Sequence, residues 1–460
     1  MADVATRADL AGARERIGEL RSSLAGAVIT PADSGYEVAR RGFNSLIDRR
    51  PAAIVRCFGA GDVATAFDFA RSLELEVAVR GGGHNPAGHC VCDDGLVIDL
   101  SLMRAVDVAA DARVASSEGG ARWLDFDLAT QRFGLVTPGG VVGSTGVAGL
   151  TFGGGIGHLT AQHGLTCDHL IAADLVTPSG ARVRADEDNP ELLWGLRGGG
   201  GNFGVATRLE FRLHPLDRVL GGRLTYVGDG VRDALRVYRD VVASAPDDFS
   251  CGALLEIADS LDPVLIVSPS YTGAEDEPSG LRALRAAPGL VGDGVVRHGF
   301  IQQQHVFNPP YGEERTYWKG HFVRELPDEL VDGLLDRMAA LGRPPGQILI
   351  ESLHGAPKRS PAVPAAVAFR EAAFNVSAMG AWLDPALDDD GVAWTRETAA
   401  ALEPWSLSGG GYVNYMQADE PIERVRAAFG EESFARLRAL KAEYDPDNVL
   451  RRNQNIPPAG

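Results

Sequence analysis

Cysteine is scarce in this chain of 460 residues, which contains only five. Their odd number and wide spacing argue against a disulfide framework. Two of them lie one residue apart but have no second pair of ligands nearby, so a structural zinc site is not expected. We expect all five to be small, buried, apolar side chains: Cys57, Cys90, Cys92, Cys167 and Cys251.

Positive charge is also in short supply, because 44 Lys and Arg stand against 62 Asp and Glu, a formal net charge of -18 at pH 7. Nucleic acids and acidic membranes are bound through clustered cations, so neither partner is expected. No apolar run approaches the roughly 20 residues that cross a bilayer, and the N-terminus lacks a secretory signal pattern. We expect a soluble, cytoplasmic protein with a small-molecule partner, and its oligomeric state stays unknown.

Glycine, by contrast, is abundant, and four glycine clusters fall within residues 80–204. They span residues 80–85, 138–149, 152–157 and 197–204. Because glycine has no Cβ, successive backbone N–H groups can approach an anion closely. Several such loops suit a long dinucleotide with a diphosphate. NAD binding is not expected, because no strand-turn-helix unit is followed by an acidic residue about 20 positions later.

The first cluster, RGGGHN, directly follows a predicted strand at residues 75–79. A second strand is predicted at residues 52–57, with a helix at 62–73 between the two. The cluster ends in His84, which would present a ring nucleophile beside the ligand of the loop. The alternative is a tight surface turn in which this histidine has no role.

The glycine content and the pattern of predicted elements change near residue 217. Up to residue 213, glycine-dense segments alternate between strand and helix patterns, with strands predicted at 97–100, 170–176 and 205–213. Beyond it, strand patterns at 222–227, 263–269, 347–351 and 373–381 alternate with amphipathic helices such as 328–341. This pattern predicts a sheet covered by helices on one face. A leading amphipathic helix is predicted at residues 8–24.

Four ordered motifs carry a family resemblance: RGGGHNPAG at 80–88, LTFGGGIGHLTAQHGLTCDHL at 150–170, LWGLRGGGGNFGV at 193–205 and YDPDNVLRRNQNI at 444–456. They resemble the berberine-bridge-enzyme-like FAD-linked oxidases of the vanillyl-alcohol oxidase and p-cresol methylhydroxylase superfamily. The first segment is also similar to that of bacterial hydroxynicotine oxidases. The resemblance covers roughly residues 51–458.

The resemblance implies an α+β fold with a split FAD-binding domain of two α/β subdomains. It also implies a substrate domain with a mainly antiparallel sheet covered by helices. The expected divisions are an N-terminal helix and lead-in at residues 1–50 and the FAD-binding domain at 51–215. The substrate-binding domain is expected at 216–404, and a segment returning to the FAD domain at 405–460.

The cofactor implied is FAD, held by a single covalent bond through His84. Some relatives add a second bond through a cysteine, but Val142 occupies the matching position. Thr145 matches a position on the oxygen path, where a small side chain admits O₂. The cofactor-binding residues expected in all are His84, Arg80, Gly81, Gly82, Gly83, Asn85, Gly88, Gly140, Val141, Val142, Thr145, Gly146, Gly149, Gly154, Gly155, Gly157, Val205, Asn453 and Asn455.

Oxidation of an alcohol or amine by a flavin also needs a base for the remaining proton. Glu351 is the first candidate, because it ends an apolar strand and can point inward, where burial would raise its pKa. A solvent-facing carboxylate is the alternative. In GGGYVNYM, we expect Tyr412 and Asn414 on one face of a strand and Tyr415 on the other. A tyrosine base requires a lowered phenol pKa. The alternative is that these tyrosines only line the apolar wall of the pocket.

Other polar residues receive more modest expectations. Asn453 and Asn455 can hydrogen-bond to the edge of the flavin ring. Residues 445–448 are expected to cap and turn the preceding helix, and residues 311–321 are candidates for lining the pocket. His158, His163 and His169 lack carboxylate or cysteine partners at ligand spacing, so no metal is expected.

The function implied is an FAD-dependent oxidase that transfers hydride from a CH–OH or CH–NH group to the flavin. O₂ then reoxidises the flavin and gives H₂O₂. Substrate classes are a glycoside, a polyketide or an alkaloid, as in secondary metabolism. Two alternatives stay open: a flavin-dependent oxygenase or oxidative cyclase, and a non-catalytic flavin-binding module. The base also stays open among Glu351, Tyr412 and Tyr415, with Thr145 assisting through O₂.

Overall fold

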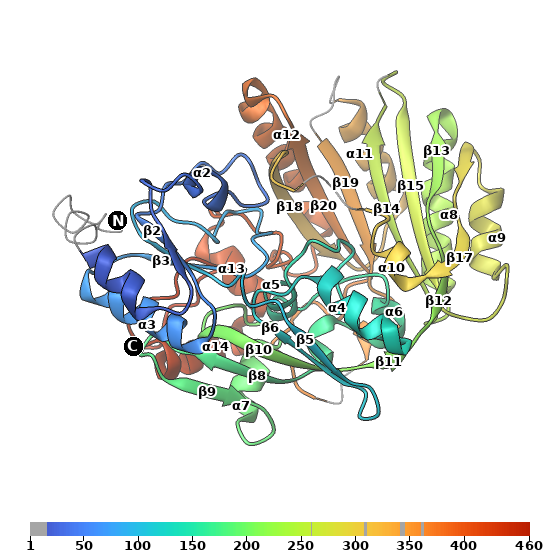
Figure 1. The fold of residues 1–460 in the computed structure, drawn as a ribbon. Helices are drawn as coiled ribbons and strands as arrows, with labels where there is room; N and C mark the ends of the chain where they lie inside the picture. The colour runs from blue at the N-terminus through green and yellow to red at the C-terminus, as the bar shows by residue number, and fades with distance from the viewer. Residues whose placement is uncertain (1–15, 259, 308–310, 341–345, 360–362) are drawn as a thin grey trace.

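The computed structural model describes residues 16–258, 260–307, 311–340, 346–359 and 363–460. Helices and separate sheets build an α+β fold, as the sequence predicts. Two smaller sheets share one side of the molecule with the C-terminal helices, and a large sheet with its covering helices forms the other side (Figure 1). None of the described helices is both long and apolar enough to span a bilayer.

The first sheet has the strand order β1-β2-β4-β3, in which β2, β3 and β4 run parallel. Their apolar residues are buried on both faces, as in parallel sheets generally. The first glycine cluster leaves the carboxyl end of β3, the usual position for a ligand loop. The elements are β1 (Ala27–Ile29), α2 (Tyr36–Ala39), β2 (Ala53–Arg56), α3 (Ala60–Ser72), β3 (Val77–Arg80) and β4 (Leu96–Asp99).

The second sheet is antiparallel and has the strand order β5-β6-β10-β8-β9. Its elements are β5 (Val106–Ala109), β6 (Val114–Glu118), α4 (Trp123–Thr130), α5 (Val147–Phe152), α6 (Thr160–His163), β8 (Leu170–Val176), β9 (Arg182–Ala185), α7 (Pro190–Leu196) and β10 (Val205–Arg212). A short pair, β7 (Leu135–Val136) and β11 (His214–Pro215), lies beside it. The C-terminal helices α13 (Ile422–Phe429) and α14 (Glu431–Tyr444) share a hydrophobic core with this sheet.

The third sheet has nine strands and is antiparallel. Its strands are β12 (Arg218–Gly221), β13 (Leu224–Val227), β14 (Phe249–Ile257), β15 (Pro263–Tyr271), β16 (Leu290–Asp293), β17 (Val296–Gly299), β18 (Arg315–Val323), β19 (Gly346–Ser352) and β20 (Phe374–Trp382). The helices of this region are α8 (Val231–Ser244), α9 (Ser279–Ala286), α10 (Phe300–Gln303), α11 (Asp328–Ala339) and α12 (Asp388–Leu402).

Successive side chains of a strand point to opposite faces, and the third sheet uses the two faces differently. On β14, Cys251, Ala253 and Leu255 are buried in the core under helices α8 and α11. The residues between them point to the other face, toward the glycine loops. The predicted sheet with helices on one face is confirmed, and Figure 1 shows these helices together behind the strands.

Some expectations concern the ends of the chain and the cysteines. Residues 8–15 of the predicted leading helix lie outside the described residues, and residues 16–23 are helical. All five cysteines are buried and free, as expected. Asp445 turns the chain after α14, where its carboxylate accepts hydrogen bonds from the backbone N–H groups of Val449 and Leu450.

A buried ion pair fixes the C-terminal return. The Lys441 and Asp445 side chains are 0% and 1% exposed, and Lys441 Nζ lies 2.6 Å from Asp445 Oδ2. The same ammonium donates to the carbonyl oxygens of Asn202 at 2.9 Å and Leu450 at 3.0 Å. One cation thereby joins α14, the fourth glycine cluster and the last segment of the chain.

Replacing Lys441 by Met should lower the free energy of unfolding by about 3–5 kcal/mol, because a buried carboxylate and two carbonyls lose their donor. Chemical denaturation of purified protein measures this. The matched change Lys358→Met, at an exposed position, should stay within about 0.5 kcal/mol of the parent. Equal losses in the two variants would contradict a structural role for Lys441.

Candidate active site

Two cavities meet between the glycine loops and the open face of the nine-stranded sheet. The glycine-lined cavity, of about 280 Å³, runs between the first two sheets and the C-terminal segment. The sheet-face cavity, of about 180 Å³, lies against β14, β15 and β19. Six residues border both cavities and define their junction: His84, Val141, Val142, Ile156, Trp318 and Tyr415.

Most of the residues expected to bind the cofactor line the glycine-lined cavity. They are Gly81, Gly82, Gly83, His84, Asn85, Val141, Val142, Thr145, Gly146, Gly149, Val205 and Asn453. The structure places the others outside this lining: Arg80, Gly88, Gly140, Gly154, Gly155, Gly157 and Asn455. Of these, Gly157 borders the sheet-face cavity.

The residues outside the lining shape the loops instead. The buried Arg80 guanidinium donates to the carbonyl oxygens of Ala39 and Arg40, so it braces the loop. Gly155 has a positive φ of 85°, and its N–H donates to the Tyr412 hydroxyl at 3.1 Å. These contacts hold the first and third glycine clusters against neighbouring segments.

The first two glycine clusters touch backbone to backbone. A Cβ on Gly82 would lie 2.4 Å from Gly146, so neither position has room for a side chain. The Tyr311 hydroxyl lies 3.2 Å from the carbonyl oxygens of Gly82 and Gly83 and donates to this pair. The Arg122 guanidinium lies 5.2 Å from the centre of the Tyr311 ring. Tyr311 is thus one residue of the 311–321 stretch that supports the loop.

His84 stands where the two cavities join. Its ring stacks on Phe43 with 4.0 Å between centroids, and its Nε2 lies 3.2 Å from Ser144 Oγ. Burial lowers the pKa of His84 to about 4, and the Arg122 charge acts in the same direction. The imidazole is therefore neutral near pH 7, the form with a nucleophilic nitrogen.

Glu351 lies on the open face of β19 and is 5% exposed, so the inward orientation is confirmed. Asn375 Nδ2, directly opposite on β20, donates to Glu351 Oε2 at 2.7 Å, and the Tyr415 hydroxyl donates to Oε1 at 3.2 Å. Burial raises the pKa of Glu351 to about 7, although both hydrogen bonds act to lower it. This carboxyl can exchange a proton near neutral pH.

The strand predicted around Tyr412 is wrong, because residues 413–415 form a turn. The Tyr415 N–H donates to the Tyr412 carbonyl at 2.8 Å and closes it. Tyr412 and Asn414 consequently meet each other, and Asn414 Nδ2 donates to the Tyr412 hydroxyl at 2.9 Å. The two tyrosine rings lie 4.8 Å apart and both border the glycine-lined cavity. Three glycines before the turn outweigh the apolar alternation that suggested a strand.

The lowered phenol pKa that a tyrosine base requires is also not found in the protein alone. Burial raises the pKa of Tyr412 and Tyr415, and the nearby Glu351 carboxylate adds to both shifts. Both phenols are therefore neutral near pH 7. Of the three candidate bases, only Glu351 titrates in the neutral range.

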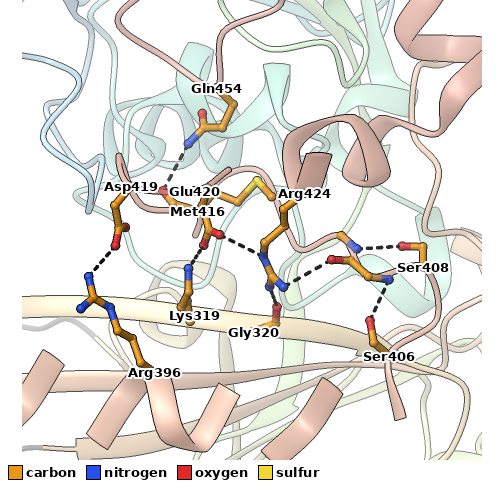
Figure 2. Close-up of polar contacts among 12 residues, drawn as sticks. Lys319, Gly320, Arg396, Ser406, Ser408, Met416, Asp419, Glu420, Arg424 and Gln454 are labelled. Carbon is orange, nitrogen blue, oxygen red and sulfur yellow. Dashed lines mark hydrogen bonds and ion pairs between the residues drawn. The ribbon is translucent and has the colours of Figure 1, made fainter. Parts of the chain in front are cut away.

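Ion pairs clamp the tyrosine turn onto the nine-stranded sheet (Figure 2). Glu420, whose side chain is 2% exposed, pairs with Lys319 on β18 and with Arg424 on α13. Arg424 also donates to the Gly320 carbonyl at 2.6 Å. Beside them, Arg396 of α12 pairs with Asp419 at 2.6 Å. The segment that follows Tyr415 is thus fixed to both β18 and α12.

The three histidines of the second motif have different surroundings. His158 borders the sheet-face cavity. The rings of His163 and His214 stack with 4.0 Å between centroids, and His214 Nε2 lies 3.1 Å from His169 Nδ1. No group of three His, Cys, Asp or Glu suited to a metal ion occurs in the described part of the chain.

Sequence reasoning missed two residues that shape the site. Ser144 contacts His84, and Asn375 contacts Glu351. The partnership of Asn375 with Glu351 depends on strand register, which no local pattern reports. Trp318 borders both cavities and Thr316 borders the sheet-face cavity, so the expectation that residues 311–321 help to line the pocket is confirmed for these two.

Comparison with known proteins assigns the chain to a family. A family model described as FAD binding domain matches residues 51–186, and one described as berberine and berberine like matches residues 411–457. The (R)-6-hydroxynicotine oxidase of Paenarthrobacter nicotinovorans is 31% identical over 95% of this chain and 98% of its own. The aclacinomycin-N/aclacinomycin-A oxidase of Streptomyces galilaeus is 27% identical over 92% and 88%.

A solved structure agrees: 6-hydroxy-D-nicotine oxidase from Arthrobacter nicotinovorans superposes with a TM-score of 0.87 at 28% identity, over 95% of this chain and 99% of that one. Fold and site define an FAD-linked oxidoreductase, an enzyme. The chain belongs to the berberine-bridge-enzyme-like oxidases of the vanillyl-alcohol oxidase and p-cresol methylhydroxylase superfamily.

The glycine-lined cavity fits FAD. Its wall includes Gly149 and Gly201, where an added Cβ would meet no atom within 4 Å, so a flat ring or a chain of phosphates can lie against bare backbone. Asn453 Oδ1 and Arg452 Nε, from residues of the same wall, are buried without a hydrogen-bond partner in the described protein. An acceptor and a donor are thereby left for a polar ligand.

Replacing Glu420 by Gln should lower the free energy of unfolding by about 3 kcal/mol, because Lys319 and Arg424 lose their shared counter-ion in a nearly buried place. It should also loosen the Tyr415 turn. Denaturation curves measure the first effect, and the fluorescence of bound FAD reports the second. Glu423→Gln, at an exposed position on α13, is the control and should change neither. A parent-like Glu420→Gln would contradict the clamp.

Proposed function

We propose that the protein is an FAD oxidase that removes two electrons and two protons from a CH–OH or CH–NH group and passes the electrons to O₂, giving H₂O₂. One observation carries this proposal: a buried carboxyl with a pKa of about 7, Glu351, faces the cavity that joins the glycine loops at His84. Names of relatives that include oxidases support it.

In this proposal His84 holds FAD by a single covalent bond. Its neutral ring, held by Phe43 and Ser144 at the junction, has the protonation state that a nucleophile needs. Val142 occupies the position where a second, thioether link would require cysteine. We further propose that residues 51–215 and 405–460 form the FAD-binding part, since α13 and α14 share the core of the second sheet.

The side chains divide the remaining work. Bound FAD supplies the two-electron oxidant. Glu351 accepts the proton of the substrate hydroxyl or amine, while Asn375 and Tyr415 hold its two carboxylate oxygens in place. Thr145, on the wall of the glycine-lined cavity, leaves room for O₂ because its side chain is small. Tyr412 orients the turn through Gly155 and Asn414.

The covalent bond is testable by acid denaturation. Parent protein should retain its yellow chromophore on the polypeptide, and His84→Ala should release it, because no other nucleophile replaces the imidazole. Absorbance of the washed precipitate at flavin wavelengths measures retention. His89→Ala, a change at a second histidine of the cavity wall, should retain the flavin. Release from the parent would sink the covalent assignment.

The base is testable through pH. The rate of anaerobic flavin reduction by an alcohol or amine substrate should rise with pH through an inflection near 7, because Glu351 must lose its proton before it can accept another. Glu351→Gln should slow this step by about 10²-fold or more and remove the inflection. Tyr412→Phe should keep it. An inflection that survives in Glu351→Gln would assign the base elsewhere.

A further inference from the structure

The open face of the nine-stranded sheet presents an ordered row of side chains across four strands. Register places Ser268 of β15 opposite Gly252 of β14, Gly252 opposite Glu351 of β19, and Glu351 opposite Asn375 of β20. Residues opposite one another share a face. The row therefore begins at a hydroxyl and ends at the Glu351–Asn375 pair, and Ser268, Gly252 and Glu351 all border the sheet-face cavity.

Gly252 makes a gap in this row. A Cβ built there would meet only the Ile350 carbonyl oxygen, at 3.8 Å, so the space above it belongs to the cavity and not to a packing neighbour. The position needs no unusual φ. The fold does not require glycine at this position. The absence of a side chain instead widens the cavity between Glu351 and the serines.

Beyond the gap, the far end of the cavity is polar and buried. Ser270, 2% exposed, faces Ser250 across the strands, and its Oγ makes no hydrogen bond with any described part of the protein. His158, 6% exposed, lies at the same end near Ser268 through Gln303. Its Nε2 likewise lacks a partner among the described residues. Buried polar atoms are nearly always paired, so these two leave hydrogen-bonding capacity for a polar ligand at one end of the cavity.

The state of His158 sets which ligand atoms suit this end. Burial lowers the pKa of His158 to about 4, against an opposing effect of the Val141 carbonyl, so the ring is neutral near pH 7. Gln303 Nε2 lies 3.3 Å from Nδ1 and can donate to it, which leaves the proton on Nε2. His158 and the serine hydroxyls can then all donate to one acceptor.

The charge of the wall excludes an anion. Among the described residues that border the sheet-face cavity there is no Lys or Arg, whereas Glu314 and Glu351 are present. A carboxylate or phosphate bound there would lose its hydration without gaining a cation. A neutral oxygen loses far less and gains the donors of Ser270 and His158.

We propose that the cavity end formed by Ser250, Ser270 and His158 binds a neutral hydroxyl or carbonyl oxygen of the substrate, and that Gly252 sets the passage to it. This inference rests on the proposed function, because it takes Glu351 as the reacting end. Ser250 and Ser270 stand one and two strands away from Glu351 and two residues further along their strands, so the bound oxygen lies roughly 10 Å from the Glu351 end of the cavity. The substrate is an elongated, uncharged or cationic molecule with polar groups at both ends.

Three rigid probes test the proposal: biphenyl-4-methanol, 4'-(hydroxymethyl)biphenyl-4-ol and 4'-(hydroxymethyl)biphenyl-4-carboxylic acid. Two aromatic rings separate the reacting carbon from the distal group by a comparable span. Calorimetric titration of the FAD-loaded protein measures binding. Flavin reduction without oxygen is recorded separately, so that binding and turnover are independent readouts.

The phenol probe should bind about five- to thirtyfold more tightly than biphenyl-4-methanol, as one or two hydrogen bonds to otherwise unpaired groups predict, and the carboxylate should bind most weakly. Ser270→Ala should remove most of the preference for the phenol. Ser117→Ala is the matched control, since Ser117 is equally buried and unpartnered but borders neither cavity.

Gly252→Val should weaken binding of the phenol probe at least tenfold by filling the gap. Gly292→Val, on strand β16 with only ordinary contact to Thr225, controls for the effect of valine in a strand and should leave binding unchanged.

Equal affinities for the three probes, tightest binding of the carboxylate, or no measurable binding of the phenol up to its solubility would each overturn the proposal. So would an unchanged preference in Ser270→Ala. Flavin reduction separates the two levels. If the phenol shows the expected preference but no probe reduces the flavin, the polar end stands and the oxidase assignment for these alcohols fails. If all three probes reduce the flavin but bind with equal affinity, the oxidase assignment stands and the proposed polar end fails.

Discussion

The buried ammonium of Lys441 is the contact on which the cofactor cavity depends. It donates to the carbonyls of Asn202 and Leu450, both of which border the glycine-lined cavity, and it pairs with Asp445. Asp445 in turn holds the backbone N–H groups of Val449 and Leu450. The Lys441 ammonium therefore joins two parts of the cavity wall that are almost 250 residues apart in sequence. Removing this charge would leave the buried Asp445 carboxylate without a counter-ion.

Burial also decides which group can do chemistry at neutral pH. It raises the pKa of Glu351, Tyr412 and Tyr415, and the outcome depends on the pKa at which each group starts. The pKa of the Glu351 carboxyl rises from 4.5 to about 7, close to neutral pH. The pKa of the Tyr412 phenol rises from 10 and moves further away from neutral pH. The same burial brings the Glu351 carboxyl into the range where it can exchange a proton near pH 7 and keeps the phenols of Tyr412 and Tyr415 neutral.

Much of this architecture could be predicted from local pattern. Strand patterns located β13, β15, β19 and β20, and the inward direction of Glu351 followed from its place on such a strand. The glycine clusters indicated the cofactor loops. Two clusters even touch at Gly82 and Gly146, as short side-chain-free segments permit. These predictions succeed because the signal lies within a few residues of its consequence.

The rest depends on contacts between distant segments. Asn375 meets Glu351 only because of strand register, and Ser144 meets His84 only because two loops converge. Around Tyr412, the glycines favour a turn that a period-2 reading cannot detect. Arg80 and Gly155 belong to the motifs assigned to the cofactor, and their hydrogen bonds to Ala39 and to the Tyr412 hydroxyl join them to segments far away in the sequence.

The alternation along β14 has a consequence for how such proteins diversify. Residues 251, 253 and 255 are held by the helical layer, whereas 250, 252 and 254 border the cavity and contribute little to that core. Changes at the second set can accumulate through descent while the first set keeps the protein folded. The substrate preference of a protein with this sheet can therefore change through the cavity residues without loss of the folded core.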